Sequence, residues 1–336
     1  MKKLLAPLVG DASPVSVIGL CKNAGKTTVM RRLMAELEDE CLGLTSVGRD
    51  GESTDLVTGT EKPDLYIKKG DLFATGRGMM RLCDCTLEAA ALTGVMTPVG
   101  EVAVFRALSD GYVQLAGPSA AGQLPALCAR FAELGANRVI IDGAAGRKSL
   151  AGAGTAGTAL LCAGASLDRD MEQVAAETAH ICRLFSCKRP ESASLCGALD
   201  ACQARFALFS PDGGPLELPL DESGSPRWGR LPREHCVLWA AGGVTDPLLK
   251  TLARRGAPLT LAATDATHIL AGRGAVDLFL RSGGRLAVRR ELTIAAVAAN
   301  PWSAYGWHFD ADRFASALRA VIDLPVVNVK EGRIWS

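Results

Sequence analysis

A glycine-rich stretch near the amino terminus, GLCKNAGKTT at residues 19–28, carries the residue types of a phosphate-binding loop. Backbone N–H groups in such a turn, and the positive end of the helix after it, attract phosphate oxygens. Lys26 is expected near the β- and γ-phosphates of a nucleotide, and Thr27 is expected to offer its hydroxyl to Mg²⁺. The usual spacing G-x-x-x-x-G-K-[ST] requires a glycine at the position of Leu20, whereas the nearest glycine is Gly19. The stretch therefore predicts a nucleotide-binding loop with one additional residue, the alternative being a chance GKTT sequence at an ordinary helix start.

Acidic residues at the ends of predicted strands supply a second requirement of nucleotide chemistry. A nucleotide hydrolase or ligase needs a carboxylate that orients Mg²⁺ or a water molecule, usually on a buried strand beside the loop. The apolar run at 137–144 contains Asp142 at its end, and the alternative for this residue is an aspartate that only caps a turn. Asp50 and Glu52 stand at the end of the segment 42–52 and are further candidates, with a solvated loop as the alternative.

Strand and helix patterns alternate along the chain and must position these residues. Residues 15–20 are predicted to form the first strand, and residues 27–40 the helix after the loop, because Val29, Leu33 and Leu37 have helical spacing. The alternation predicts an α/β fold with a doubly wound, mainly parallel sheet. The glycine-rich turn would then lie between a strand and a helix, as phosphate binding requires.

The distribution of turn-forming residues suggests a division of the chain. Residues 206–235 are rich in Gly, Pro, Ser and Asp, which is typical of an irregular connection. We expect a nucleotide-binding core at 1–205 and a C-terminal α/β extension at 206–336, which either continues the same sheet or builds its own. Within the core, residues 100–119 are expected to form a hairpin.

Composition argues against several classes of partner. Lys plus Arg (37) nearly balances Asp plus Glu (36), so no net field favours nucleic acid or an acidic membrane surface. No signal peptide or membrane span is expected, and a cytoplasmic location is predicted. The 11 cysteines lack CxxC pairs of the kind that bind structural zinc, so buried thiols are favoured and a nickel or cobalt metallochaperone stays an alternative.

Three further motifs have both a functional and a structural interpretation. Residues 117–119 (Gly-Pro-Ser) precede a predicted helix and are favoured as its N-terminal cap. Arg147 and Lys148 follow the Asp142 strand and would meet a phosphate or an acidic substrate, unless they are an ordinary exposed basic pair. Asn300-Pro301 ends an apolar strand and is favoured as a turn.

The loop spacing, with its one extra residue, resembles the loops of dethiobiotin synthetase and the cobyrinate amide-forming synthases, which belong to the SIMIBI class of P-loop proteins. The run KNAGKTT also resembles the KNSGKTT loop of MobB in that class. The resemblance implies ATP, with GTP as the alternative, and Mg²⁺ held at Thr27 and Asp142. Catalytic roles are expected for Lys26, Asp142 and Asp50, the last at the position of a switch acidic residue. The expected nucleotide-binding residues are Gly19, Asn23, Ala24, Gly25, Lys26, Thr27, Thr28 and the base-reading Asn300. Lys22 stands four residues before Lys26, where the class places its signature lysine five before, so Lys22 receives no role.

A wider set of motifs is similar to the KamB family: VIGLCKNAGKTT, GRDGE, AGPS, IIDGAAGRKS, DATHIL and NPWSAYG. This family is described as the P-loop reactivase subunit for lysine 5,6-aminomutase of lysine fermentation, accompanied by a MutS-like ATPase partner. The resemblance implies a slow Mg-dependent ATPase that helps to restore an adenosylcobalamin-dependent lysine or ornithine aminomutase. Its expected partners are that aminomutase and the MutS-like ATPase, and a homodimer is also left open. No D-x-H-x-x-G cobalamin motif is present in the chain.

Two other functional classes remain open at this point. An ATP-dependent ligase of the dethiobiotin synthetase or cobyrinate synthase type would need its own small-molecule pocket. A nucleotide-gated binding module or metallochaperone would bind ATP and change partners without appreciable turnover.

Overall fold

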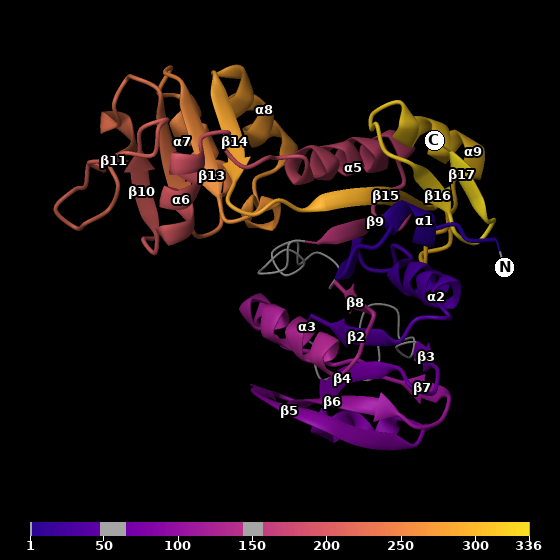
Figure 1. The fold of residues 1–336 in the computed structure, drawn as a ribbon. Helices are drawn as coiled ribbons and strands as arrows, with labels where there is room; N and C mark the ends of the chain where they lie inside the picture. The colour runs from indigo at the N-terminus through magenta and orange to yellow at the C-terminus, as the bar shows by residue number, and fades with distance from the viewer. Residues whose placement is uncertain (1, 48–64, 144–156, 336) are drawn as a thin grey trace. The chain divides into compact units, whose positions relative to one another are not determined.

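The computed structural model describes residues 2–47, 65–143 and 157–335. They form two compact units, one made of residues 1–179 and 293–336 and the other of residues 180–292 (Figure 1). This division differs from the expected boundary after residue 205. The second unit is an insertion, and the chain returns to the first unit at Thr293.

The first unit contains a large, mostly parallel sheet in the order β17-β16-β15-β9-β1-β8-β2-β4-β6-β5. Neighbouring strands from β16 to β4 are parallel, while the pairs at both ends of the sheet are antiparallel. The mixed α/β fold with a mainly parallel sheet is therefore confirmed. The strands are β1 (Val15–Gly19), β2 (Leu42–Ser46), β4 (Leu72–Gly76), β5 (Leu87–Thr97), β6 (Gly100–Ala107), β8 (Arg138–Asp142), β9 (Thr158–Gly164), β15 (Thr293–Asn300), β16 (Val326–Asn328) and β17 (Arg333–Trp335).

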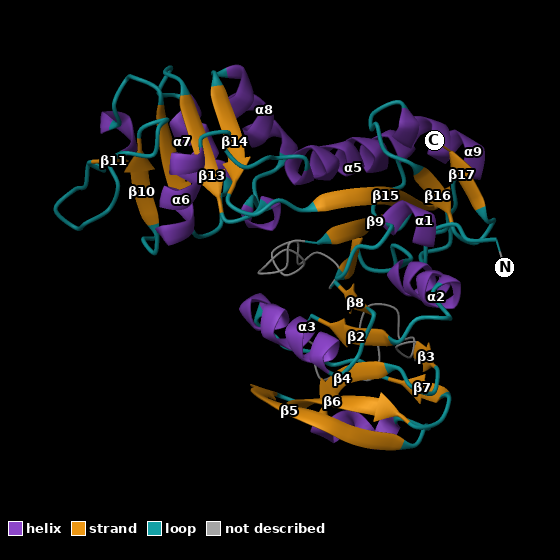
Figure 2. Ribbon diagram, viewed as in Figure 1, coloured by secondary structure: helices purple, strands orange, loops and turns teal. Residues whose placement is uncertain are grey.

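Apolar side chains from both faces of this sheet are covered. On β8, Ile140 joins a cluster with Leu33 of α2 (Lys26–Glu36), while Ile141 joins a separate cluster with Phe131 of α3 (Leu124–Glu133). Because alternate residues of a strand point to opposite faces, α2 and α3 must cover opposite sides of the sheet, as Figure 2 shows. The other α-helices in the described part of this unit are α1 (Ala6–Val9), α9 (Ala311–Arg319) and most of α5 (Met171–Phe185).

The expected hairpin at 100–119 is wrong. β6 pairs with β4 and β5, whereas β7 (Gly111–Val113) pairs with β3 (Leu65–Ile67) in a separate two-stranded sheet. β6 is an interior strand, and four consecutive residues from Val102 to Phe105 are buried. Such a run favours pairing on both sides, which a simple hairpin could not provide.

The second unit contains a five-stranded sheet in the order β11-β10-β12-β13-β14. Three adjacent strands of this sheet, β12, β13 and β14, are parallel, and each begins and ends level with its neighbour. The largest buried side chain is Trp239 on β12, whose indole N–H donates to the Ala204 carbonyl. The elements are β10 (Phe206–Phe209), β11 (Pro215–Leu216), β12 (Cys236–Ala240), β13 (Leu259–Ala263), β14 (Gly284–Val288), α6 (Ala193–Ala201), α7 (Asp246–Ala253) and α8 (Arg273–Arg281).

None of the helices in the described part of the chain combines the length and the apolar character needed to cross a bilayer.

Candidate functional site

The glycine loop, defined as residues 19–25, connects β1 to α2 at the carboxyl edge of the parallel strands. Its first part continues the sheet, because the Leu20 N–H donates to the Cys162 carbonyl on β9 at 3.1 Å. The loop then turns through two residues with left-handed backbone, Asn23 at φ 58° and Gly25 at φ 101°. Glycine adopts this conformation without a Cβ clash, so Gly25 can end the turn immediately before the helix starts.

The displaced glycine of the sequence motif has a structural role. A Cβ placed on Gly19 would lie 3.1 Å from both Cγ and Cδ of Lys26. The aliphatic stem of Lys26 therefore folds back beside the start of the glycine loop. Thr27 and Thr28 follow Lys26 in the first turn of α2, and both side chains are half-buried. The expected loop residues are thus assembled in one turn between a strand and a helix.

Gly164, at the end of β9, is a neighbour of the glycine loop that was not identified from the sequence. A Cβ on Gly164 would lie only 2.8 Å from the Cα atom of Ala24. The backbone of the loop passes so close that a side chain at this position would force it to move. The only sequence signal was a glycine that ends an apolar strand, which many strands share.

Asp142 stands at the end of β8, in register with Val17 on β1 and Ser46 on β2. Its Oδ1 atom is fully enclosed and accepts no hydrogen bond from the described residues. Burial raises the pKa of this carboxyl above its usual value, and the positive charge of Lys26 acts in the opposite direction. A buried carboxylate oxygen without a hydrogen-bond donor is costly, so this position favours a cation or an ordered water.

Asn300, at the end of β15, packs against the glycine loop. Its Nδ2 donates to the Asn23 carbonyl at 3.3 Å, and its Oδ1 accepts from the Trp302 N–H at 3.2 Å. A Cβ on Gly25 would lie 3.4 Å from the Asn300 Cβ. The structure brings Asn300 into the site, with both polar ends of its amide engaged by the chain.

Gly117 also reaches this edge of the sheet. Its N–H donates to the Ser46 Oγ at 3.1 Å, and a Cβ there would lie 2.0 Å from the Ser46 carbonyl oxygen. The expectation that residues 117–119 cap a helix is wrong, because α3 begins at Leu124 with Gln123 as its N-cap. A close backbone approach to β2, which no local pattern reveals, explains the glycine.

Other predicted site residues fall outside the described part of the chain. These are Asp50, Glu52, Arg147 and Lys148. All eleven cysteines are free thiols. Among the residues that the structure describes, no three His, Cys, Asp or Glu side chains come together as metal ligands.

The described residues fit a phosphate and Mg²⁺ by the chemistry of their donors. The turn at Gly25 opens directly onto the amino terminus of the 11-residue helix α2, whose first N–H groups favour an anion. Mg²⁺ is usually held by one or two carboxylates together with substrate phosphates and water, so a single enclosed carboxylate such as Asp142 is sufficient on the protein side.

The chain was compared with family models, curated proteins and solved structures. It matches no protein-family model, no curated protein and no solved structure.

Proposed function

We propose that this chain is a P-loop NTPase that binds Mg-ATP at the glycine loop, with GTP as the alternative nucleotide. The observation that carries the proposal is the combination of two groups at one sheet edge. The Lys26 stem lies beside Gly19, and the charge of Lys26 acts on Asp142, whose Oδ1 has no hydrogen-bond donor among the described residues.

Each residue has a separate task in this proposal. Backbone N–H groups of the loop and of the first turn of α2 bind the phosphates, and Lys26 places a positive charge on them. Thr27 and Asp142 would hold Mg²⁺, which, when bound, neutralises phosphate charge and activates or orients water. Asn300 and Gly164 act indirectly, because they support the loop backbone through Asn23 and Ala24.

Binding of Mg-ATP to the full chain tests the nucleotide proposal, with Lys26→Ala as the decisive variant. We expect Lys26→Ala to weaken binding at least about 30-fold, because a positive charge beside the phosphates is lost, while the melting temperature changes little. Lys250→Ala is the matched control, since Lys250 is an exposed lysine on α7 that forms an ion pair with Asp246 of the same helix. If Lys26→Ala and Lys250→Ala bind Mg-ATP like the wild type, the glycine loop is not a phosphate site.

The client of this NTPase is proposed from the family resemblance. On that basis the chain is a subunit of a reactivating factor for an adenosylcobalamin-dependent lysine or ornithine aminomutase, and works with a MutS-like ATPase. A motor of this kind should hydrolyse ATP slowly alone and faster with its client.

Recovery of a damaged aminomutase tests the client. Inactivated aminomutase is mixed with fresh adenosylcobalamin, Mg-ATP, this chain and the MutS-like ATPase. Recovery of mutase activity should require every component and fail with Lys26→Ala. Equal recovery without this chain would reject the reactivase proposal. Consumption of ATP only with a small second substrate would instead identify a ligase.

A further inference from the structure

A short hairpin rich in aromatic residues follows β15. We call residues 301–309 the aromatic hairpin. Its two arms pair through a bridge between Trp302 and His308, and the Phe309 N–H donates to the Pro301 carbonyl at 2.9 Å. Gly306, at φ 94°, forms the turn at its tip. These contacts keep the hairpin in a defined shape although much of it is exposed.

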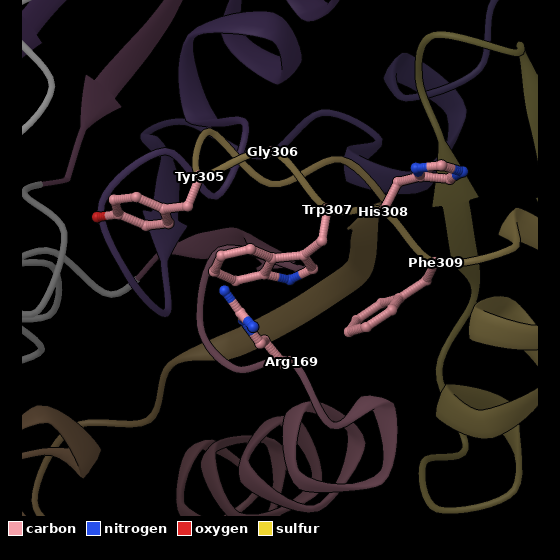
Figure 3. A pocket seen from close by; sticks show the side chains of 6 residues that line it. All are labelled: Arg169, Tyr305, Gly306, Trp307, His308 and Phe309. Carbon is pink, nitrogen blue, oxygen red and sulfur yellow. The ribbon is translucent and has the colours of Figure 1, made fainter.

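The aromatic rings of the hairpin form an accessible surface. Tyr305 and Trp307 stack with their ring centres 5.6 Å apart, and the guanidinium of Arg169 lies 4.8 Å from the centre of the Trp307 ring. They line a hollow of about 370 Å³ together with residues 306, 308 and 309. Figure 3 shows the Trp307 indole in the middle of this group, with Arg169 on one side and Tyr305 next to it. Tyr305 is 47% exposed, so an aromatic ring is presented to solvent at the hollow.

The aromatic hairpin is hydrogen-bonded to the same sheet edge that the glycine loop contacts. The Trp307 Nε1 donates to the Ala165 carbonyl at 3.0 Å, and the Ala304 N–H donates to the Ser166 Oγ at 3.1 Å. Ala165 directly follows Gly164, on which Ala24 of the glycine loop rests. The aromatic hairpin and the glycine loop are therefore supported by consecutive residues at the end of β9.

The amide of Asn300 is held by hydrogen bonds to the glycine loop and to the aromatic hairpin. Reading a base by hydrogen bonds requires an acceptor and a donor presented together, as a side-chain amide can do. In Asn300 the oxygen accepts from Trp302 and one N–H donates to Asn23, so these contacts fix the orientation of the amide and leave it one N–H and one lone pair. Stacking makes no such demand, because every base has a π face.

We propose that the hollow of the aromatic hairpin is the base subsite of the nucleotide, and that the exposed ring of Tyr305, which stacks on Trp307, binds the base by stacking, without distinguishing adenine from guanine. This inference rests on the proposed nucleotide-binding function. It identifies the ligand class as nucleoside triphosphates, of which ATP and GTP should bind alike. Arg169 supports the ring of Trp307 from beside the hollow and adds positive charge near the ligand.

Comparison of nucleotides with a phosphate chain that has no base tests this inference. Dissociation constants are measured for Mg-ATP, Mg-GTP and Mg-tripolyphosphate with wild type, Tyr305→Ala and Tyr305→Phe. Tyr305→Ala should weaken ATP and GTP equally, by about 10-fold, and leave tripolyphosphate unchanged, because a stacking partner of the base alone is lost. Tyr305→Phe keeps the ring and should bind like the wild type.

Two control variants separate local from general effects. Tyr112→Ala removes a tyrosine of similar exposure, 46%, on β7, and should change none of the three dissociation constants. Lys26→Ala should weaken all three ligands. Circular dichroism and thermal melting confirm that each variant is folded.

The possible outcomes are distinct. If Tyr305→Ala binds both nucleotides like the wild type, or weakens tripolyphosphate as much as ATP, the base subsite is rejected while the phosphate site stands. A change in the ATP-to-GTP ratio in Asn300→Ala, with the fold intact, would assign base reading to Asn300 and also reject the inference. If the wild type binds neither nucleotide nor tripolyphosphate, the proposed function itself fails.

Discussion

Each unit carries polar groups at the carboxyl edge of its own parallel strands. The hydrogen bonding of these groups differs between the two units. In the first unit, Asp142 at the end of β8 accepts no hydrogen bond at Oδ1 within the described chain, and the adjacent turn leaves N–H groups at a helix start. In the second unit, Asp265 after β13 accepts at Oδ1 from the Thr267 N–H, the Thr267 hydroxyl and His268 Nδ1, at 3.0, 2.5 and 2.9 Å.

Two other polar side chains at the second edge also form hydrogen bonds within the chain. Thr264 Oγ1 donates to the Ala241 carbonyl, and Arg289 donates to the carbonyls of Leu199 and Cys202 while it stacks on Trp239. Asp265 Oδ2 accepts no hydrogen bond from the residues that the structure describes, but the charge of Arg290 acts on this carboxylate. The carboxyl edge of a parallel sheet is thus a place where a ligand can bind. The hydrogen bonds that the chain itself makes there decide which polar groups are left to contact a ligand.

The largest expected effect is a loss of Mg-ATP affinity on substitution of a glycine at the first edge, with a glycine of the second unit as the control. Gly164→Ala puts a Cβ 2.8 Å from the Ala24 backbone, so the glycine loop must shift, and we expect Mg-ATP affinity to fall on the order of 100-fold. Gly242→Ala, in the segment after β12, meets no atom within 4 Å and should leave affinity and melting temperature unchanged. Calorimetry and thermal melting measure both quantities. Equal affinities of the two variants would show that the loop does not depend on Gly164.

A smaller effect, on the free energy of unfolding, is expected from removing the charge of Asp142 or of Asp265. The sign of this effect should differ between the two edges. Asp265→Asn should lower the free energy of unfolding by about 1–3 kcal/mol, because charged hydrogen bonds to Thr267 and His268 are weakened. Asp142→Asn should raise it by up to about 1 kcal/mol without Mg²⁺, because a charge is removed whose enclosed Oδ1 has no hydrogen-bond donor among the described residues, and should reduce Mg-dependent hydrolysis. Urea unfolding of both variants decides the signs. Destabilisation by Asp142→Asn would mean that Asp142 has a structural role in the fold.

The smallest expected effect is a difference between Asp265 and Asp142 in how their contributions to stability depend on pH. Burial opposes ionisation of Asp265, but the contacts from His268 and Thr267 outweigh it and lower its pKa below 3.8, so its stabilising effect is lost as pH falls below that value. Burial raises the pKa of Asp142 above 3.8, so the contribution of Asp142 to the free energy of unfolding falls as pH rises above that value. Melting temperatures without Mg²⁺ should therefore show the Asp265→Asn deficit shrinking in acid, and the Asp142→Asn gain growing as pH rises. Parallel pH trends for the two variants would contradict these directions.

Local patterns predicted the elements that carry the glycine loop. The run at 15–20 contains β1, and the segment 137–144 contains β8 with Asp142 at its end. The helix expected at 27–40 is α2, which includes Val29 and Leu33 but ends at Glu36, before Leu37. These features depend on residues a few positions apart, whose periodicity is visible in the sequence. The boundary after residue 205 was not matched by the compact units, because β15 pairs with β9 more than 120 residues earlier in the chain.

The sequence by itself determined that Lys26 starts a helix after a glycine turn, since backbone conformation there depends on Gly25 and its immediate neighbours. Only the tertiary structure decided that Gly164 supports Ala24, that the amide of Asn300 is engaged by the loop, and that Trp307 is anchored to Ala165. Each of these contacts joins segments separated by more than 100 residues. Strand order brings them together, and no spacing along the chain encodes strand order when parallel strands are connected by crossovers of variable length.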